Sequence, residues 1–211
     1  MTPLALHFLR HGQTTFSRDN GLSGSGIDPD LTEAGLEMAR AFALAYRSTP
    51  WAGVYVSPLA RARQTARPLC EALGVEPRVR EGLREIHYGT WEGRTPEEVS
   101  RDDHDAYLRW AADPAYHAPT GGETALAIER RVRLVLDEVR ETHAGGNVLL
   151  VSHKATIRIA LASLLGMDVG RFRDRISCPG VSLTGGEMGP RGPLLKLLGD
   201  RSHLSDALRS L

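Results

Sequence analysis

Two apolar runs of the sequence end in histidine and basic residues. Residues 4–9 lead directly into Arg10 and His11. Residues 147–151 lead through a serine into His153. Short apolar runs that stop abruptly are typical of buried strands, and open α/β sheets bind ligands beyond the carboxyl ends of such strands. We therefore expect Arg10, His11 and His153 to face each other across one crevice.

A third basic group follows a third apolar run. Residues 53–56 are followed by a short turn and then by Arg61, near the start of a predicted helix. A cluster of cations needs an anion to balance its charge, and guanidinium groups match phosphate oxygens with paired hydrogen bonds. Arg61, together with Arg10 and His11, therefore predicts an oxyanion site that contains a candidate histidine nucleophile.

Spacing argues against two other kinds of site. His7 and His11 are four residues apart, which on a helix would suggest a metal pair. On a strand that rises about 3.3 Å per residue, they lie about 13 Å apart, too far to share an ion. Gly24 and Gly26 have no predicted strand before them and no helix after them. They therefore do not predict a dinucleotide site.

The elements that must position these groups alternate along the chain. Besides the three strands above, two late apolar runs predict edge strands. Alternating strands and helices imply an α/β fold, a three-layer sandwich with a mainly parallel central sheet flanked by helices. The predicted helices cover residues 31–47, 60–73, 123–143 and 155–165, and the two late strands cover residues 181–183 and 194–198.

Single residues refine the expected helix ends. Gly74 stands where the glycine after a helix is expected, and Pro68 is expected to shorten or kink the helix before it. Glu123 is expected to stabilise the N-terminus of its own helix. Trp91 and Glu92 are expected to pack and shape a loop.

The length favours one domain over residues 1–211. Residues 89–122 have weak periodicity, so we expect a small insertion of short helices and loops there. The formal net charge is zero, which gives no reason to expect nucleic-acid binding. Cys70 and Cys178 stand alone in the sequence and are expected to be free thiols.

The start of the chain lacks the pattern of a signal peptide. No apolar stretch is long enough to cross a bilayer. We therefore expect a cytoplasmic protein without membrane contact.

Five segments carry a recognisable pattern, in order along nearly the whole chain. They are residues 9–14 (Leu-Arg-His-Gly-Gln-Thr), 57–66, 83–93, 121–124 and 151–153. An Arg-His-Gly triplet alone occurs by chance, whereas five segments at consistent spacing are specific. In these segments the sequence resembles the histidine phosphatase superfamily, also called the phosphoglycerate mutase-like family, and in particular its phosphatases.

The resemblance implies a role for each matching residue. His11 would attack phosphorus and become phosphorylated. Arg10, Arg61 and His153 would hold the non-bridging oxygens, where charge is greatest in the transition state. Glu85 would protonate the leaving alkoxide and then deprotonate the water that hydrolyses the phosphohistidine.

The resemblance also implies a metal-independent site without a cofactor. His11 must be neutral to attack, and two nearby guanidinium groups lower its pKa. Ser23 and Gly24 fall where family members offer a hydroxyl and a backbone N–H to the phosphate. Lys154 departs from the family, which tends to have glycine there, and the side chain either adds a cation to the pocket or points away from it. Ser17 also departs, because the family often has asparagine at this position.

Three functions are compatible with the resemblance. The first is a phosphomonoesterase acting on a small phosphorylated metabolite. The second is a cofactor-dependent phosphoglycerate mutase, but mutases carry arginine where this chain has Ile86, and residues 93–122 contain no Arg-Arg pair. The third is an inactive binding module, which would usually have lost one of the matching residues. The phosphatase is therefore preferred, with Glu92 as the alternative acid should Glu85 fail.

The resemblance does not select one substrate among the classes on which family members act. These include α-ribazole phosphate, phosphoserine, sugar phosphates and phosphorylated glycerates. Residues 89–122 and 168–180, the second of which contains Arg171, Arg173 and Arg175, are expected to choose among them. A homodimer is also left open.

Overall fold

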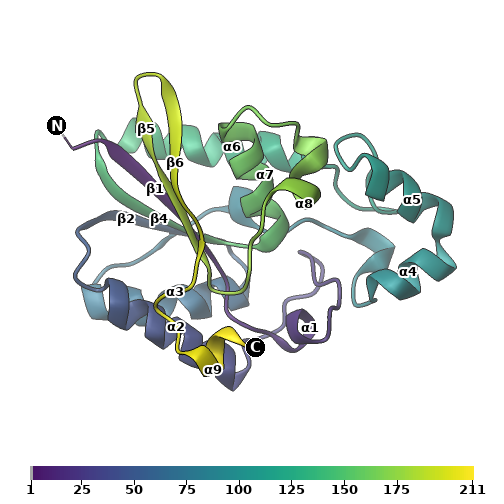
Figure 1. The fold of residues 1–211 in the computed structure, drawn as a ribbon, viewed down its shortest axis with the longest axis horizontal. Coiled ribbons are helices and arrows are strands. Elements are labelled where there is room, and N and C mark those ends of the chain that lie inside the picture. The colour runs from purple at the N-terminus through teal and green to yellow at the C-terminus, as the bar shows by residue number, and fades with distance from the viewer. Residues whose placement is uncertain (1) are drawn as a thin grey trace.

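The computed structural model describes residues 2–211 and contains one six-stranded sheet (Figure 1). The strand order is β3-β2-β4-β1-β5-β6. The strands from β3 to β1 are parallel, and β5 and β6 each run antiparallel to the strand before them. The predicted α/β fold with a mainly parallel sheet is confirmed. The strands are β1 (Leu4–Arg10), β2 (Trp51–Val56), β3 (Arg78–Val79), β4 (Gly146–Ser152), β5 (Leu183–Gly189) and β6 (Gly192–Asp200).

Helices follow most of the strands and cover the sheet. No helix within residues 2–211 combines the length and the apolar character needed to cross a membrane. The α-helices are α1 (Thr15–Arg18), α2 (Glu33–Tyr46), α3 (Ala60–Leu73), α4 (Pro96–Asp102), α5 (His104–Ala112), α6 (Ala125–Thr142), α7 (Lys154–Leu164), α8 (Phe172–Arg175) and α9 (Asp206–Arg209). Three short 3₁₀ helices are η1 (Glu81–Leu83), η2 (Gly89–Trp91) and η3 (Val169–Arg171).

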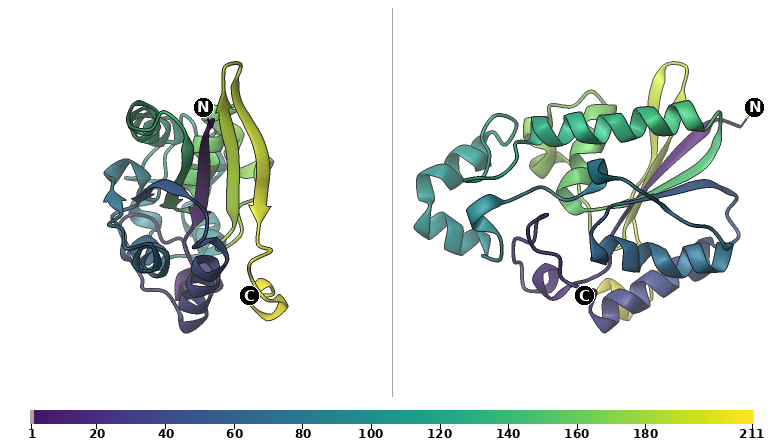
Figure 2. Two further views of the ribbon diagram at one scale, coloured as in Figure 1. Left: turned by 90° about the vertical axis from the view of Figure 1, so that its left-hand side faces the viewer. Right: turned by 180° about the vertical axis from the view of Figure 1, so that it is seen from behind.

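Side chains alternate along the strands between two hydrophobic layers. Leu6 and Phe8 of β1 lie in one buried cluster, with Ile128 of α6. Leu9 lies in the other cluster, with Phe42 of α2. Figure 2 shows α6 on one side of the strands and α2 with α3 on the other. The sheet is therefore the middle layer of three, because residues in a strand alternate with a period of two.

Helix α3 has the predicted bounds, Ala60–Leu73. It ends at Gly74, whose φ of +64° is readily adopted by glycine. The helix continues through Pro68, so the expected shortening is wrong. Leu69 and Cys70, which follow the proline, are buried, and this packing offsets the backbone hydrogen bond that proline cannot make.

Two sequence-based details are corrected by the structure. β5 begins at Leu183 and lies between β1 and β6, so it is neither a strand over 181–183 nor an edge strand. Val181 stands in a turn with φ +46°. Glu123 lies before α6, whose N-cap is Thr124, and its carboxylate pairs with arginines instead. β6 is the edge strand and includes the predicted residues 194–198.

Residues 89–122 contain α4 and α5, which lie together at one end of the molecule (Figure 1). Trp91, Val99 and Trp110 form a small separate hydrophobic cluster there. Trp91 is fully buried, and its indole N–H donates to Asp103 Oδ2 over 2.8 Å. The expectation that Trp91 packs within this segment is confirmed.

Candidate active site

The carboxyl ends of neighbouring parallel strands bring the predicted groups together. Arg10 ends β1 and pairs in register with Ser152, which ends β4. The backbone N–H of His11 donates to Ser152 O over 3.0 Å, so the two chain segments leave the sheet side by side. As a result, the ring centroids of His11 and His153 lie 5.1 Å apart.

His11 is buried, with 5% of its surface exposed. Its Nδ1 lies 2.8 Å from Gly12 O, which can only accept, so Nδ1 carries the proton. The lone pair is therefore on Nε2. Burial, and then the charges of Arg61 and Arg10, hold the pKa of His11 well below its usual value. The ring is neutral and able to act as a nucleophile.

Gly12 is required by a close approach of two backbones. A Cβ at Gly12 would lie 2.6 Å from Gly35 O at the start of α2. The N–H of Gly12 donates to Thr65 Oγ1 over 2.9 Å, and that hydroxyl donates to Arg61 O over 2.7 Å. α2 and α3 thus fix the backbone that carries His11.

His153 is fully buried, and its Nε2 lies 2.7 Å from Ser57 Oγ. Ser57 Oγ also accepts a hydrogen bond from Leu59 N over 3.3 Å. In residues 2–211 no other acceptor takes the Ser57 proton, so the hydroxyl donates to Nε2 and the His153 proton sits on Nδ1. Burial, and then the charge of Arg61, hold the pKa of His153 well below its usual value.

The two arginines are bound by backbone carbonyls. Arg10 Nη1 donates to Cys178 O over 2.8 Å. Arg61 is fully buried; its Nη1 donates to Ile27 O (3.0 Å) and Asp28 Oδ1 (3.2 Å). Arg61 Nη2 donates to the carbonyls of residues 23 and 24 (3.2 and 2.9 Å). Both Nη atoms of Arg61 are bound within the protein and only its Nε is free, so the expected role of Arg61 in holding phosphate oxygens rests on Nε alone.

Three buried donors at this site have no partner. Within residues 2–211, eight buried side-chain nitrogens make no hydrogen bond, and three of them are Arg10 Nε, Arg61 Nε and His153 Nδ1. Each unpaired buried donor costs about 1–3 kcal/mol, so a group of three calls for a shared acceptor. An oxyanion supplies several acceptor lone pairs at once. The described residues contain no group of three His, Cys, Asp or Glu side chains that could hold a metal ion.

Glu85 is buried and held by backbone donors. Its Oε1 accepts from Ile86 N (3.0 Å) and Thr156 N (3.1 Å), and its Oε2 accepts from Ala155 N (3.1 Å). The Thr156 hydroxyl lies nearer to Arg84 O (2.7 Å) than to Glu85 Oε1 (3.2 Å), so its proton goes to the carbonyl. Oε2 therefore keeps a free lone pair that can carry a proton.

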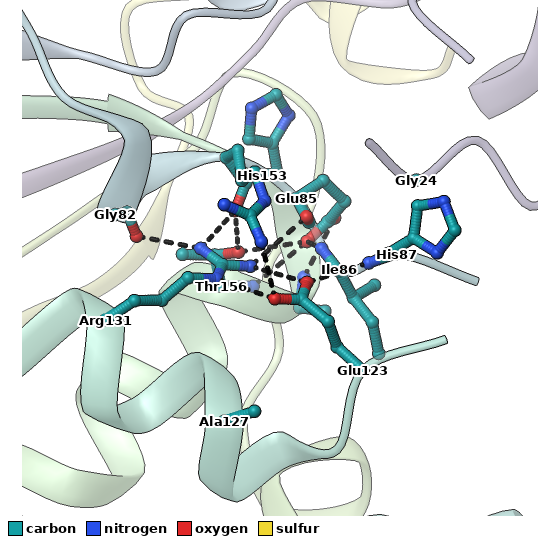
Figure 3. A network of polar contacts seen from close by, with 12 residues as sticks. Gly24, Gly82, Glu85, Ile86, His87, Glu123, Ala127, Arg131, His153 and Thr156 are labelled. Carbon is teal, nitrogen blue, oxygen red and sulfur yellow. Dashed lines mark hydrogen bonds and ion pairs between the residues drawn. The ribbon is translucent and has the colours of Figure 1, made fainter. Parts of the chain in front are cut away.

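A charged network supports the segment that carries Glu85. Figure 3 shows Arg131 reaching from α6 to this segment, with Glu123 beside it. Arg131 donates to the carbonyls of Gly82 (2.8 Å), Arg84 (2.7 Å) and Glu85 (3.2 Å) and pairs with Glu123 (3.2 Å). Because one guanidinium binds three backbone carbonyls within residues 82–85, the position of Glu85 depends on Arg131.

Glu92 fixes the loop that covers Arg61. Its carboxylate accepts from the backbone N–H groups of Gly24 (2.7 Å), Gly26 (3.2 Å) and Tyr88 (3.0 Å). These contacts fit the expectation that Glu92 shapes a loop. They also occupy the Gly24 N–H, so the expected hydrogen bond from this group to the phosphate is not available.

A cavity of about 110 Å³ lies at this point of the fold. Lys154 lines it, which answers the question that the sequence left open about the direction of this side chain. Ser17 also lines it, although its hydroxyl is bound to Thr14 in a capping box. The predicted site residues that line the cavity are Arg10, His11, Ser23, Glu85 and Lys154, and the lining residues that were not predicted include Asn20 and Tyr88.

Three supporting residues were missed by the sequence analysis. Arg131 left a signal, because it stands between Ile128 and Val132 on the apolar face of α6, where a cation needs a buried partner. Thr156 left none, because small polar residues are common in first helical turns. Ser57 begins the matching segment 57–66, but no role was assigned to it.

Comparison with known proteins identifies the family of this chain. Residues 6–201 match the family model described as the histidine phosphatase superfamily (branch 1). Phosphoserine phosphatase 1 of Hydrogenobacter thermophilus is 30% identical over 95% of this chain and 94% of its own length. The adenosylcobalamin/alpha-ribazole phosphatase of Salmonella typhimurium is 32% identical over 83% and 88%.

A solved mycobacterial structure shares the same fold. The glucosyl-3-phosphoglycerate phosphatase complexed with VO3 superposes with a TM-score of 0.85, at 29% identity, over 93% of this chain and 99% of that one. The family-model match over residues 6–201 includes every strand end described above. The protein therefore belongs to the histidine phosphatase superfamily, branch 1, and is a phosphatase enzyme of that family.

Proposed function

We propose that this protein hydrolyses small phosphomonoesters without a metal ion, through a phosphohistidine on Nε2 of His11. Two relatives support the reaction by name, since one is a phosphoserine phosphatase and another an alpha-ribazole phosphatase. The observation that carries the mechanism is a neutral histidine with three unpartnered buried donors close to it.

In the first step, the lone pair of His11 Nε2 attacks phosphorus in line with the ester bond. The N–P bond forms, the P–O bond to the alcohol breaks, and its electron pair goes to the alcohol oxygen. Glu85, protonated on Oε2, gives its proton to that oxygen, so the alcohol leaves neutral. The hydrogen bond from Nδ1 to Gly12 O stabilises the ring as it becomes positive.

In the second step, water attacks the phosphohistidine. The Glu85 carboxylate accepts a proton from the water, the new O–P bond forms, and the electron pair of the N–P bond returns to Nε2 of His11. Inorganic phosphate leaves and the starting state is restored. Throughout, Arg10 Nε, Arg61 Nε and His153 Nδ1 donate to the non-bridging oxygens, where negative charge develops.

The mechanism predicts that hydrolysis of an aryl phosphate continues in excess chelator. His11→Ala should lower turnover by about 10³-fold or more, because the Nε2 lone pair of His153, the other neutral histidine at the site, already accepts a hydrogen bond from Ser57. Rapid quenching with labelled substrate should trap an acid-labile phosphoryl group on the wild type, whereas the exposed control His104→Ala should label normally. Loss of activity in chelator that a divalent ion restores, or label that persists on His11→Ala, would contradict the mechanism.

We also propose a cytoplasmic location. Cys70 and Cys178 are both free and buried. Unpaired thiols are typical of reducing compartments. Fractionation of the source cells with activity as the readout tests this location, and recovery of the protein outside the cytoplasmic fraction would contradict it.

A further inference from the structure

A second cavity adjoins the one that contains His11. Its volume is about 340 Å³, and it lies between α7, α8 and the segment that carries α4 and α5. Four residues line both cavities: Asn20, Leu22, Tyr88 and Lys154. A substrate whose phosphoryl group lies at His11 can therefore extend its alcohol part into the second cavity.

The walls of the second cavity are aromatic and basic. Tyr88 and Trp110 supply ring surfaces. Lys154, Arg158 and Arg173 supply three cations. Asp174 is the one carboxylate that also lines it; it is exposed, and one of its oxygens lies 4.0 Å from Arg171 outside the cavity. The wall thus carries an excess of positive charge.

The side chains of Arg158 and Arg173 are held in place by the protein. Arg158 Nε donates to Ile176 O, and Arg158 Nη2 donates to Arg173 O over 2.9 Å. The Arg173 guanidinium lies over the Trp110 ring, 4.0 Å from its centroid, which leaves its edge N–H groups free to donate. Both groups are therefore oriented before any ligand arrives.

No acid within residues 2–211 pairs with Lys154, Arg158 or Arg173 in an ion pair. Partial loss of solvent around the side chain, and then the neighbouring charges of Arg10 and Arg158, lower the pKa of Lys154. These cations repel one another, and an anion between them would remove the repulsion.

We propose that Lys154, Arg158 and Arg173 bind a negatively charged group on the alcohol part of the substrate. The preferred substrates are then phosphomonoesters of hydroxy acids or similar anionic alcohols. Tyr88 and Trp110 pack against the apolar part that joins the two charged ends. This inference rests on the proposed function, because it assumes that the phosphoryl group lies at His11.

The test compares two substrates that differ in one group. 3-Phosphoglycerate carries a carboxylate where glycerol 3-phosphate carries a hydroxymethyl group. The ratio of their kcat/KM values should favour 3-phosphoglycerate by at least about tenfold in the wild type, since a charge-assisted hydrogen bond contributes that much. Lys154→Gln and Arg173→Gln should each lower the ratio about fivefold or more. Lys196→Gln on the edge strand β6, which lines neither cavity, should leave it unchanged.

A ratio near one in the wild type, or a ratio that Lys154→Gln does not change, overturns the proposal. Continued hydrolysis of an aryl phosphate would show that the proposed function survives such a failure. If neither substrate is hydrolysed, calorimetry on the His11→Ala variant measures the two dissociation constants directly. Tighter binding of 3-phosphoglycerate that Lys154→Gln abolishes supports the subsite, and equal binding of the two compounds overturns it.

Discussion

His11 and His153 remain uncharged although they lie within one cluster of cations. Burial and the neighbouring arginines both disfavour the imidazolium form, so the two effects add. The proton of each ring is placed by one hydrogen bond, from Nδ1 to a carbonyl in His11 and from a serine hydroxyl to Nε2 in His153. The same pocket thus contains one nucleophile and one donor made from the same residue type.

Glu85 should matter most for poor leaving groups. Glu85→Gln keeps the shape but cannot give or take a proton, and general acids contribute about 10²–10⁴-fold when an alkoxide must leave. We expect a loss of this size for alkyl phosphates and a smaller loss of the phosphorylation rate for nitrophenyl phosphate. Single-turnover time courses that compare alcohol release with phosphate release measure both steps.

Equal losses on both substrates would argue against a general acid at Glu85. The phosphohistidine should also persist longer in Glu85→Gln, because the second step loses its base. Glu97→Ala is a suitable control, since Glu97 is an exposed carboxylate in the first turn of α4 and makes no contact with Glu85 in the hydrogen bonds of residues 2–211.

Ser57 should act through the tautomer of His153. Without the hydroxyl, Nε2 has no donor, and the proton can move away from the Nδ1 that would hold the phosphate. Ser57→Ala should lower kcat/KM about tenfold, the effect of one lost hydrogen bond to a charged group. Nitrogen chemical shifts of the His153 ring report the tautomer directly. A shift pattern identical to that of the wild type would show that Ser57 only packs, and Ser57→Thr should restore both readouts.

At the scale of elements, the ends of the predicted strands located the site in the sequence. The apolar runs before Arg10 and His153 were long enough to identify parallel strands, and parallel strands end at one edge. The loop over residues 23–28 had no such pattern. Its shape depends on Glu92, about 65 residues away, and on carbonyls that bind Arg61. Contacts between distant segments leave no periodic signal in the chain.

The loop over residues 23–28 should loosen when Glu92 loses its charge and its acceptors. Glu92→Ala frees three backbone N–H groups, and the carbonyls that bind Arg61 then lose their support. We expect kcat/KM to fall about tenfold, because each lost charged hydrogen bond weakens the loop by about 1.5–3 kcal/mol. Hydrogen exchange should accelerate at residues 22–28.

Exchange confined to residues 94–103, with the loop unchanged, would contradict this role of Glu92. Glu97→Ala is the matched control, because Glu97 is an exposed carboxylate in the first turn of α4. It should leave kinetics and loop exchange as in the wild type.

At the scale of the whole molecule, the sequence predicted the layers but not the order of the late strands. A helix with an apolar stripe, such as α6, or a strand buried on both faces, such as β4, can be recognised from the residues of that segment alone. The position of β5 between β1 and β6 depends on pairing across the sheet. Gly185 and Gly186 have no apolar side chain, so the sequence of β5 lacks the pattern that marks a buried strand. The predicted edge position failed for that reason.

The neutral histidines also make the stability of the whole fold depend on pH. Burial comes first among the causes that lower the pKa of His7, His11, His153 and His203 from the ordinary 6.5. Below about pH 6.5 these histidines bind protons in the unfolded chain but not in the folded chain, so the free energy of unfolding falls as the pH falls. Each such histidine contributes up to about 1.4 kcal/mol per pH unit between its two pKa values.

Urea unfolding at several pH values between about 7 and 5, in a buffer without phosphate, measures this slope. His11→Asn and His153→Asn should each reduce it by about one proton, because the residue that titrates only in the unfolded chain is removed. Val132→Ala, a buried apolar change in α6, should lower stability at every pH and leave the slope as in the wild type. If His11→Asn keeps the wild-type slope, His11 takes up its proton equally in the folded and unfolded chain, and the neutral nucleophile on which the mechanism depends is absent.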